Sequence, residues 1–285
     1  MNLGPIELAA VPLLLLLVAF LLYRAQRISE VDLQRWADAN GVSISSAGAR
    51  VRRYLAWSRR CRALGFLGAI GLSATLAGGL GPLEAAIFGF VGYLLGALLA
   101  ELVINRPARA SGVALLKPRI VTEYAPRYAL NGLRGASLCF LVLEGAYSLT
   151  PLGARWAESA TAPVPDATTA RFVASTLAVA LLVAIVEGML RLIVARRQPA
   201  SSPENKAVDD AMRAASARAV TGGGLALLCL AIAGEALGFQ SLEGVAGLIA
   251  RMLGAAAIVA ALVVWFALSK PRGNRLAARA DALSV

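Results

Sequence analysis

The stretch Arg171 to Val194, RFVASTLAVALLVAIVEGMLRLIV, decides the fold class of this chain. Apart from Arg171, Glu187 and Arg191, it consists of apolar and small residues. An α-helix needs about 20 mainly apolar residues to cross the roughly 30 Å hydrocarbon core of a bilayer. The stretch therefore predicts a transmembrane helix with two charges near one of its ends.

Six other apolar runs have similar lengths, and together they predict an all-α bundle of seven transmembrane helices. The predicted spans are residues 5–23, 64–80, 83–104, 132–149, 171–194, 219–237 and 245–268. Composition agrees, because 58% of the residues are hydrophobic and only 16% are charged, against roughly a quarter charged in a typical soluble domain. We expect one integral membrane domain over residues 1–285.

The Lys and Arg residues predict the orientation of these spans, because cytoplasmic loops carry the excess of positive charge. Of the 28 Lys and Arg residues, all but Arg155, Arg171 and Arg251 fall on one side of the predicted bundle. That side is the cytoplasmic one if the N-terminus is outside. No Lys or Arg precedes the first apolar run, so this run is expected to be a retained anchor rather than a cleaved signal peptide. The expected location is the cell membrane, with a cytoplasmic C-terminus.

Residues 24–62 are predicted to form a cytoplasmic amphipathic segment. Ser29 is expected to cap a short helix that stops at Asn40 and Gly41. A second amphipathic stretch, residues 48–60, is expected to lie on anionic lipid headgroups through its arginines, which are Arg50, Arg52, Arg53, Arg59 and Arg60. A further short amphipathic helix is predicted from Pro203 onward, in the loop before the span at 219–237.

Composition and motifs exclude several functional classes. The chain has no histidine, the commonest metal ligand and the usual general base near neutral pH, and it lacks the nucleotide-binding and hydrolase motifs. Three cysteines imply no disulfide framework. We therefore expect a non-enzymatic protein without a cofactor or metal. The net charge of +11 lies in loops between apolar runs, which favours anionic lipid as the partner and not nucleic acid.

Four acidic residues inside the predicted spans are the candidate polar groups, together with two arginines. An ionised carboxylate at the centre of a bilayer costs roughly 2.5–3.5 kcal/mol, so such a group is expected to face protein or a polar partner. The candidates are Glu101, Glu144, Glu187, Arg191, Glu235 and Arg251. Either they form structural ion pairs, or they belong to a pathway for protons or cations.

Each acid has its own expected environment. Glu144 is predicted to be nearest the bilayer centre and to face the bundle interior. Glu187 is expected to pair with Arg191 four residues later, and Glu235 with Arg251 on the neighbouring helix. Glu101 is expected at a helix end, where it is solvated or meets a loop arginine.

The loop before the fourth span holds Arg119, Tyr124 and Arg127 beside or near the prolines at 118 and 126. These residues are candidates for contact with a cytoplasmic partner or a lipid headgroup. The alternative is an ordinary positively charged loop with its tyrosine at the membrane interface.

Two sequence patterns suggest a relationship. The stretches Trp36…RVRRYL (50–55) and LKPRI…YAPR (116–127) resemble uncharacterised multi-pass membrane proteins of high-GC actinobacteria, a family that implies no reaction. Residues 94–101 also resemble 181–187, and 132–144 resemble 222–235, which indicates a parallel internal repeat or a chance similarity of apolar helices. The expected function is that of a permease-like component or membrane-embedded complex subunit handling a small solute, ion or lipid. The alternative is a scaffold or signalling partner that recruits a cytoplasmic protein.

Overall fold

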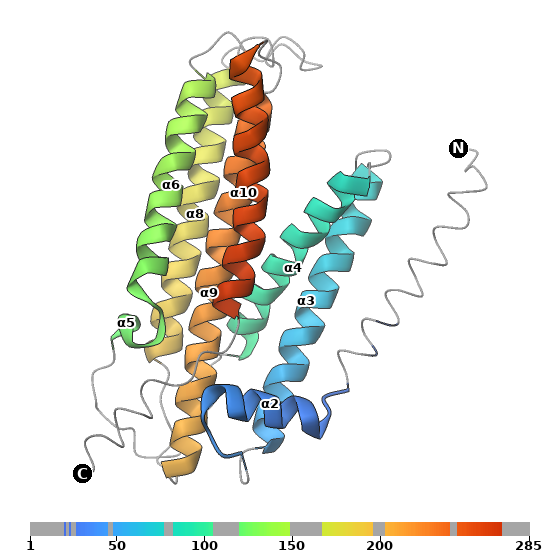
Figure 1. Ribbon diagram of the computed structural model, residues 1–285, viewed down its shortest axis with the longest axis vertical. Coiled ribbons are helices and arrows are strands. Elements are labelled where there is room, and N and C mark those ends of the chain that lie inside the picture. Colours follow the sequence, from blue (N-terminus) through green and yellow to red (C-terminus); the bar gives the residue numbers. More distant parts are fainter. Residues whose placement is uncertain are drawn as a thin grey trace, which may run out of the picture. The chain divides into compact units, whose positions relative to one another are not determined.

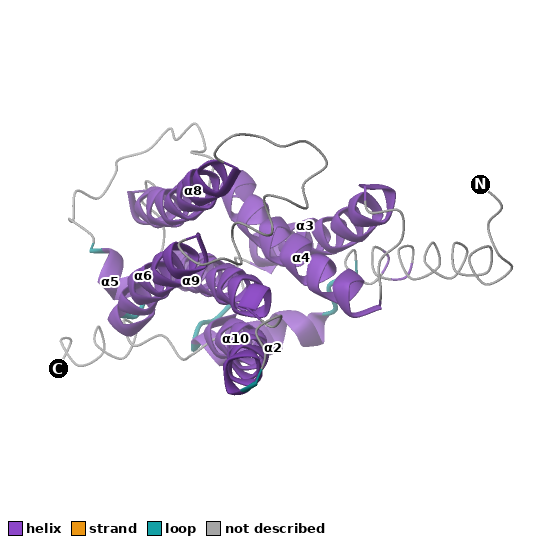
Figure 2. Ribbon diagram, turned by 90° about the horizontal axis from the view of Figure 1, so that it is seen from above, coloured by secondary structure: helices purple, strands orange, loops and turns teal. Residues whose placement is uncertain are grey.

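The computed structural model is helical throughout the part of the chain that it describes. That part comprises residues 20, 23, 27–44, 48–76, 82–104, 120–148, 167–195, 203–239 and 244–269. Within it there are eight helices and no strand (Figure 2). The helices are α2 (Glu30–Asn40), α3 (Gly48–Leu76), α4 (Pro82–Ile104), α5 (Val121–Tyr124), α6 (Arg127–Ser148), α8 (Ala167–Ala195), α9 (Pro203–Gly238) and α10 (Val245–Ser269). The predicted all-α class is confirmed.

Three of these helices are long and apolar enough to cross a membrane. They are the stretches Thr169–Ala195, Glu204–Gly238 and Val245–Leu268 of α8, α9 and α10. They contain the predicted spans at 171–194, 219–237 and 245–268. The chain is therefore a candidate membrane protein on structural as well as compositional grounds.

The other predicted spans do not meet this requirement among the described residues, so the structure supports three spans and not seven. Most of 5–23 lies outside those residues, as does the end of 64–80. The apolar stretch described in α4, Ile87–Val103, is shorter than a full span. Residues 132–148 of the segment 132–149 are helical within α6, but Arg134 and Glu144 interrupt its apolar character.

The chain separates into two compact units. Unit 1 comprises residues 1–118, 196–216 and 271–285, and unit 2 comprises 119–195 and 217–270. Helix α9 contributes its first residues to unit 1 and the remainder to unit 2. The expectation of one integral domain stays a prediction.

The capped helix predicted after Ser29 is confirmed as α2. The Ser29 hydroxyl accepts a hydrogen bond from the backbone N–H of Asp32, and the Asp32 carboxylate accepts one from the backbone N–H of Ser29, which together form a capping box. The helix ends at Asn40, and Gly41 follows in the left-handed conformation at φ 63°. Glycine adopts this conformation without the steric cost that a Cβ imposes.

The short helix predicted from Pro203 is instead the start of the continuous helix α9. The segment between Pro203 and Thr221 is rich in alanine, the strongest helix former, and contains no glycine or internal proline to stop it. Glycines follow at 222–224 without breaking the helix, because Gly222 packs against Leu268 and Gly224 against Val186.

The arginines expected on lipid mostly bind acids of unit 1. Arg50 forms an ion pair with Asp209 of α9, Arg52 with Glu30, and Arg59 with Asp32 at 3.2 Å. The segments pack around an apolar cluster of Leu33, Trp36, Val51, Tyr54, Val208, Ala211 and Met212. The sequence predicted an amphipathic segment over residues 24–62 and a separate short amphipathic helix from Pro203 onward. Their complementary charges and apolar faces bring them together instead.

Helices α3 and α4 run side by side as a hairpin in unit 1 (Figure 1). A Cβ built on Gly65 would overlap the backbone carbonyl oxygen of Gly92, and one built on Gly96 would overlap that of Cys61. The backbones therefore meet directly, as small residues permit in membrane helices. Gly92 and Gly96 thus allow close packing, whereas a Cβ built on Gly68 or Gly135 would meet nothing within 4 Å.

In unit 2, helices α6, α8, α10 and the second part of α9 form a bundle (Figures 1 and 2). Gly224 of α9 packs on α8 and α6, Gly222 on α10, and Gly238 on Tyr147 of α6. Helix α9 thus contacts all three neighbours. Every polar group on its buried face must find a partner within this bundle.

Candidate functional site

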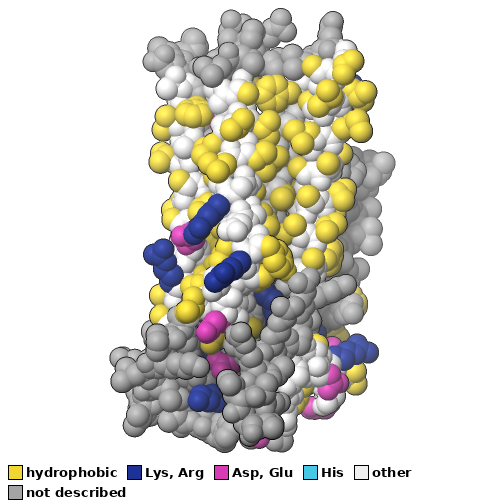
Figure 3. Space-filling view, turned by 60° about the vertical axis from the view of Figure 1, so that its left-hand side comes forward, with side chains coloured by type: hydrophobic (Ala, Val, Ile, Leu, Met, Phe, Trp, Pro, Cys, Tyr) yellow, Lys and Arg dark blue, Asp and Glu magenta, His cyan; other side chains and the backbone are white. Residues whose placement is uncertain are grey.

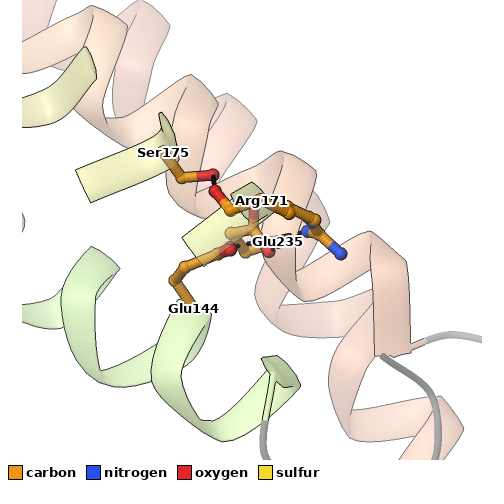
Figure 4. A network of polar contacts seen from close by, with 4 residues as sticks. All are labelled: Glu144, Arg171, Ser175 and Glu235. Carbon is orange, nitrogen blue, oxygen red and sulfur yellow. Dashed lines mark hydrogen bonds and ion pairs between the residues drawn. The ribbon is translucent and has the colours of Figure 1, made fainter. Parts of the chain in front are cut away.

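Three helices of unit 2 bring two acids and one arginine together near their ends. Glu144 lies four residues before the end of α6, Arg171 four residues after the start of α8, and Glu235 three residues before the end of α9. We call these three residues the Glu144–Arg171–Glu235 cluster (Figure 4). Antiparallel neighbouring helices place such positions at one level of a bundle.

The arginine binds both carboxylates. Its Nη2 lies 2.7 Å from Oε2 of Glu235 and 3.5 Å from Oε2 of Glu144. Glu144 is fully buried, and the side chain of Glu235 is 12% exposed. The two carboxyl groups are also within interacting range of each other. The prediction that Glu144 faces the bundle interior is confirmed.

An aromatic ring packs against the guanidinium. Its central carbon lies 4.0 Å from the ring centroid of the buried Tyr147, a cation–π contact, and Phe239 meets the ring of Tyr147 edge to face at 5.2 Å. The hydroxyl of Ser175 donates a hydrogen bond to the backbone carbonyl of Arg171, one turn earlier in α8. The arginine side chain therefore contacts two carboxylates and one aromatic ring.

The cluster holds more negative than positive charge. Two carboxylates share one guanidinium, and among the described residues no donor reaches Oε1 of Glu144, which is buried. A surplus charge in apolar surroundings is costly unless another charge compensates it. The arrangement favours binding one proton, or one small cation, between the two carboxyl groups.

The predicted pair of Glu235 with Arg251 is wrong. Glu235 binds Arg171, whereas Arg251 is an exposed residue of α10. Glu144 lies four residues before the end of α6 at Ser148, about 6 Å along the helix axis, and its expected depth in the bilayer stays a prediction. The cluster lies toward the end of the bundle and not at its middle.

The predicted pair of Glu187 with Arg191 is confirmed. Nη2 of Arg191 lies 3.6 Å from Oε2 of Glu187. A second arginine, Arg134 of α6, reaches the other oxygen of the same carboxylate at 3.3 Å. Here one carboxylate pairs with two arginines, whereas in the Glu144–Arg171–Glu235 cluster one arginine pairs with two carboxylates.

Glu101 is not solvated, as one of its two expected environments required, and the other, contact with a loop arginine, stays a prediction because residues 105–119 lie outside the described part of the chain. Glu101 is buried at the end of α4, where the hydroxyl of Tyr54 on α3 donates a hydrogen bond to its Oε1 at 3.3 Å. Burial, with the charge of Glu101 as the next cause, raises the pKa of Tyr54 well above its ordinary value. The helix end is not solvated, because α3 covers it.

The loop candidates have different environments. Arg119 lies outside the described residues. Tyr124 is buried on α5, so it does not stand at the surface to meet a partner. Arg127 begins α6 and is exposed.

Sequence reasoning missed the two residues that hold the buried acids. Arg171 was counted only as an exception to the charge rule, and Tyr54 appeared only as part of the stretch at residues 50–55. The available signal for Arg171 was its position on the outer side, against the charge rule, since an arginine there needs a partner. No signal of comparable strength identified Tyr54.

Comparisons with known proteins give no further guide to the site. No family model, curated protein or solved structure matches this chain. Among the described residues no group of three or more potential ligands could hold a metal ion. The resemblance to multi-pass membrane proteins of actinobacteria stays a prediction, and the functional argument rests on the geometry of the cluster.

Proposed function

We propose that this chain is a non-enzymatic, multi-pass membrane protein of permease type, or a membrane-embedded subunit of a complex, that exchanges a proton or small cation at the Glu144–Arg171–Glu235 cluster. The proposed orientation places the spans in the cell membrane with the N-terminus outside and the arginine-rich loops in the cytoplasm.

One observation carries the proposal, namely that two carboxylates, one of them fully buried, share a single guanidinium. A charge-balanced ion pair needs one acid for each arginine. The second acid adds a charge that must be compensated whenever the site is closed to water. Protonatable carboxyl groups between helices are also the groups that proton relays in membranes use.

The mutation that restores the charge balance tests the site directly. Glu144→Gln leaves one carboxylate for one guanidinium, so the cluster should no longer take up a proton near neutral pH. In purified protein, infrared difference spectra recorded across a pH step should show the carbonyl band of a protonated carboxyl group in the wild type and lose it in Glu144→Gln. Glu187→Gln is the matched control, because that acid already faces two arginines and its loss should leave the band unchanged.

A flux measurement then distinguishes a site that only binds a proton from a pathway that carries protons across the membrane. In proteoliposomes with a pH gradient and a trapped pH-sensitive dye, the wild type should dissipate the gradient and Glu144→Gln should be at least tenfold slower. A wild type that shows the infrared band but no flux retains the proton-binding site and lacks the permease activity. A wild type with neither would refute the proposal.

The alternative function is a scaffold or signalling partner without transport. A specific observation favours it, since Glu101, Glu144, Glu187 and Glu235 each have a partner in the structure. If these contacts are structural, Glu144→Gln and Glu235→Gln should be less stable than the wild type, and the folded variants should be as active as the wild type in any cellular assay. Retention of a copurifying cytoplasmic protein by both variants would support the scaffold.

A further inference from the structure

A second group of charged side chains is exposed on the surface of unit 2. Arg134 of α6 and Arg191 of α8 both contact the carboxylate of Glu187, and their side chains are 66% and 77% exposed. The face shown in Figure 3 is largely apolar, with a few charged side chains interrupting it. We call Arg134, Glu187 and Arg191 the surface triad.

The surface triad has a surplus of positive charge. One carboxylate opposes two guanidinium groups, and both arginines project from the bundle. Arg191 lies within one of the helices long enough to cross a membrane, four residues before its end, so it is near the boundary of the hydrocarbon. An arginine at this depth must reach polar headgroups or bind an anion, because its charge is poorly tolerated in the apolar region.

The surroundings of the surface triad are apolar and exposed. Leu138 and Val142 follow Arg134 at intervals of one helical turn on the same face of α6, and they are 64% and 70% exposed. Leu181 and Ile185 are exposed on α8. A molecule with a negatively charged head and extended apolar chains matches this combination of a cationic pair and an apolar face.

We propose that the surface triad binds the phosphate of an anionic phospholipid, whose acyl chains lie along the exposed faces of α6 and α8. Arginine forms paired, charge-assisted hydrogen bonds to phosphate oxygens, and two arginines fixed by one carboxylate present their remaining donors outward. This site is separate from the Glu144–Arg171–Glu235 cluster and does not depend on transport.

The test measures lipid preference in the full-length protein. Purified protein is titrated with phosphatidylglycerol or phosphatidylcholine in detergent, and bound lipid is counted by native mass spectrometry. The wild type should prefer phosphatidylglycerol. Arg134→Gln with Arg191→Gln should weaken that binding about 25-fold, because each arginine near an anionic lipid contributes about a fivefold factor. Arg251→Gln, which removes an exposed arginine of α10, should leave it unchanged.

Two further variants keep the proposal falsifiable if the double substitution disturbs folding. Arg134→Lys with Arg191→Lys keeps the charge and should retain most of the preference. Glu187→Gln removes the competing anion and should strengthen phosphatidylglycerol binding about fivefold. An unchanged preference in the double glutamine variant would overturn the proposal. Complete displacement of the lipid by millimolar inorganic phosphate would also overturn the proposal. So would a double glutamine variant that loses a copurifying protein and keeps its bound lipid.

Discussion

At the residue scale, the most informative feature is that each acid inside a predicted span contacts a partner from another helix. Glu144 and Glu235 share Arg171, Glu187 binds Arg134, and Glu101 accepts from Tyr54. The sequence alone predicted that Glu144 would be buried, because a lone carboxylate in an apolar helix has a high desolvation cost. It could not identify Arg171 as the partner, because that requires the level at which α6, α8 and α9 meet.

Tyr54 should make the stability of unit 1 depend on alkaline pH. Burial raises the pKa of Tyr54 above the ordinary 10.0, so the folded state favours the protonated phenol. A raised pKa contributes stability that is fully present below pH 10.0 and is lost as the pH rises through the folded value. We expect the phenolate absorbance of one tyrosine to be absent above pH 10.0 until the protein unfolds.

The control for this titration is Tyr54→Phe, which should remove the late phenolate signal. It also takes away a donor from the buried carboxylate of Glu101 and should reduce the free energy of unfolding in mixed micelles by about 1–3 kcal/mol. Tyr128→Phe, at an exposed position, should change stability much less. A phenolate of Tyr54 that appears with the other tyrosines would show that the hydroxyl is open to water.

At the element scale, local signals predicted helix ends well and helix continuity poorly. Ser29 and Gly41 bound α2 as expected, since capping hydrogen bonds and a left-handed glycine depend only on nearby residues. The extent of α9 depends on what surrounds it. Gly222 and Gly224 are tolerated because α10 and α8 pack against them, and no local pattern reveals that contact.

The contact between α3 and α4 predicts opposite effects for two glycines on the same helix. Gly65→Ala would push a Cβ into the carbonyl oxygen of Gly92, so the helices must separate, and we expect a loss of about 1–3 kcal/mol. Gly68→Ala meets nothing within 4 Å and should stabilise the helix by up to about 1 kcal/mol. Thermal unfolding of the purified variants measures both. Equal effects would mean that the two helices do not touch at Gly65.

At the scale of the whole molecule, hydropathy predicted the class and loop charge predicted the orientation. The division into two units was not foreseen. The start of α9 belongs to unit 1, where Asp209 forms an ion pair with Arg50 and Val208 packs in the apolar cluster, while the rest of the helix is apolar. Hydropathy averaged along the sequence detects the apolar part of α9. It does not reveal that the polar residues before this part continue the same helix.

Site-directed labelling tests orientation and the extension of α9 together. A cysteine is introduced singly at Lys206, Ser159, Ala278 or Met252 in a chain without its native cysteines. In right-side-out vesicles, an impermeant maleimide should label position 159 and leave 206 and 278 unlabelled until the membrane is opened. Position 252, on the exposed apolar face of α10, should stay unlabelled in lipid throughout. Labelling of 206 from outside would reverse the orientation.

The glycine contact in the α3–α4 hairpin also bears on the order of assembly. Glycine has no side-chain rotamers to lose, so joining the two backbones at Gly65 and Gly92 carries little entropy cost beyond that of the helices themselves. The two helices follow each other in sequence, and contacts between near neighbours form fastest. The hairpin should therefore close during insertion, before the ion pairs to α9 can form, and offer the later segment a surface that is already ordered.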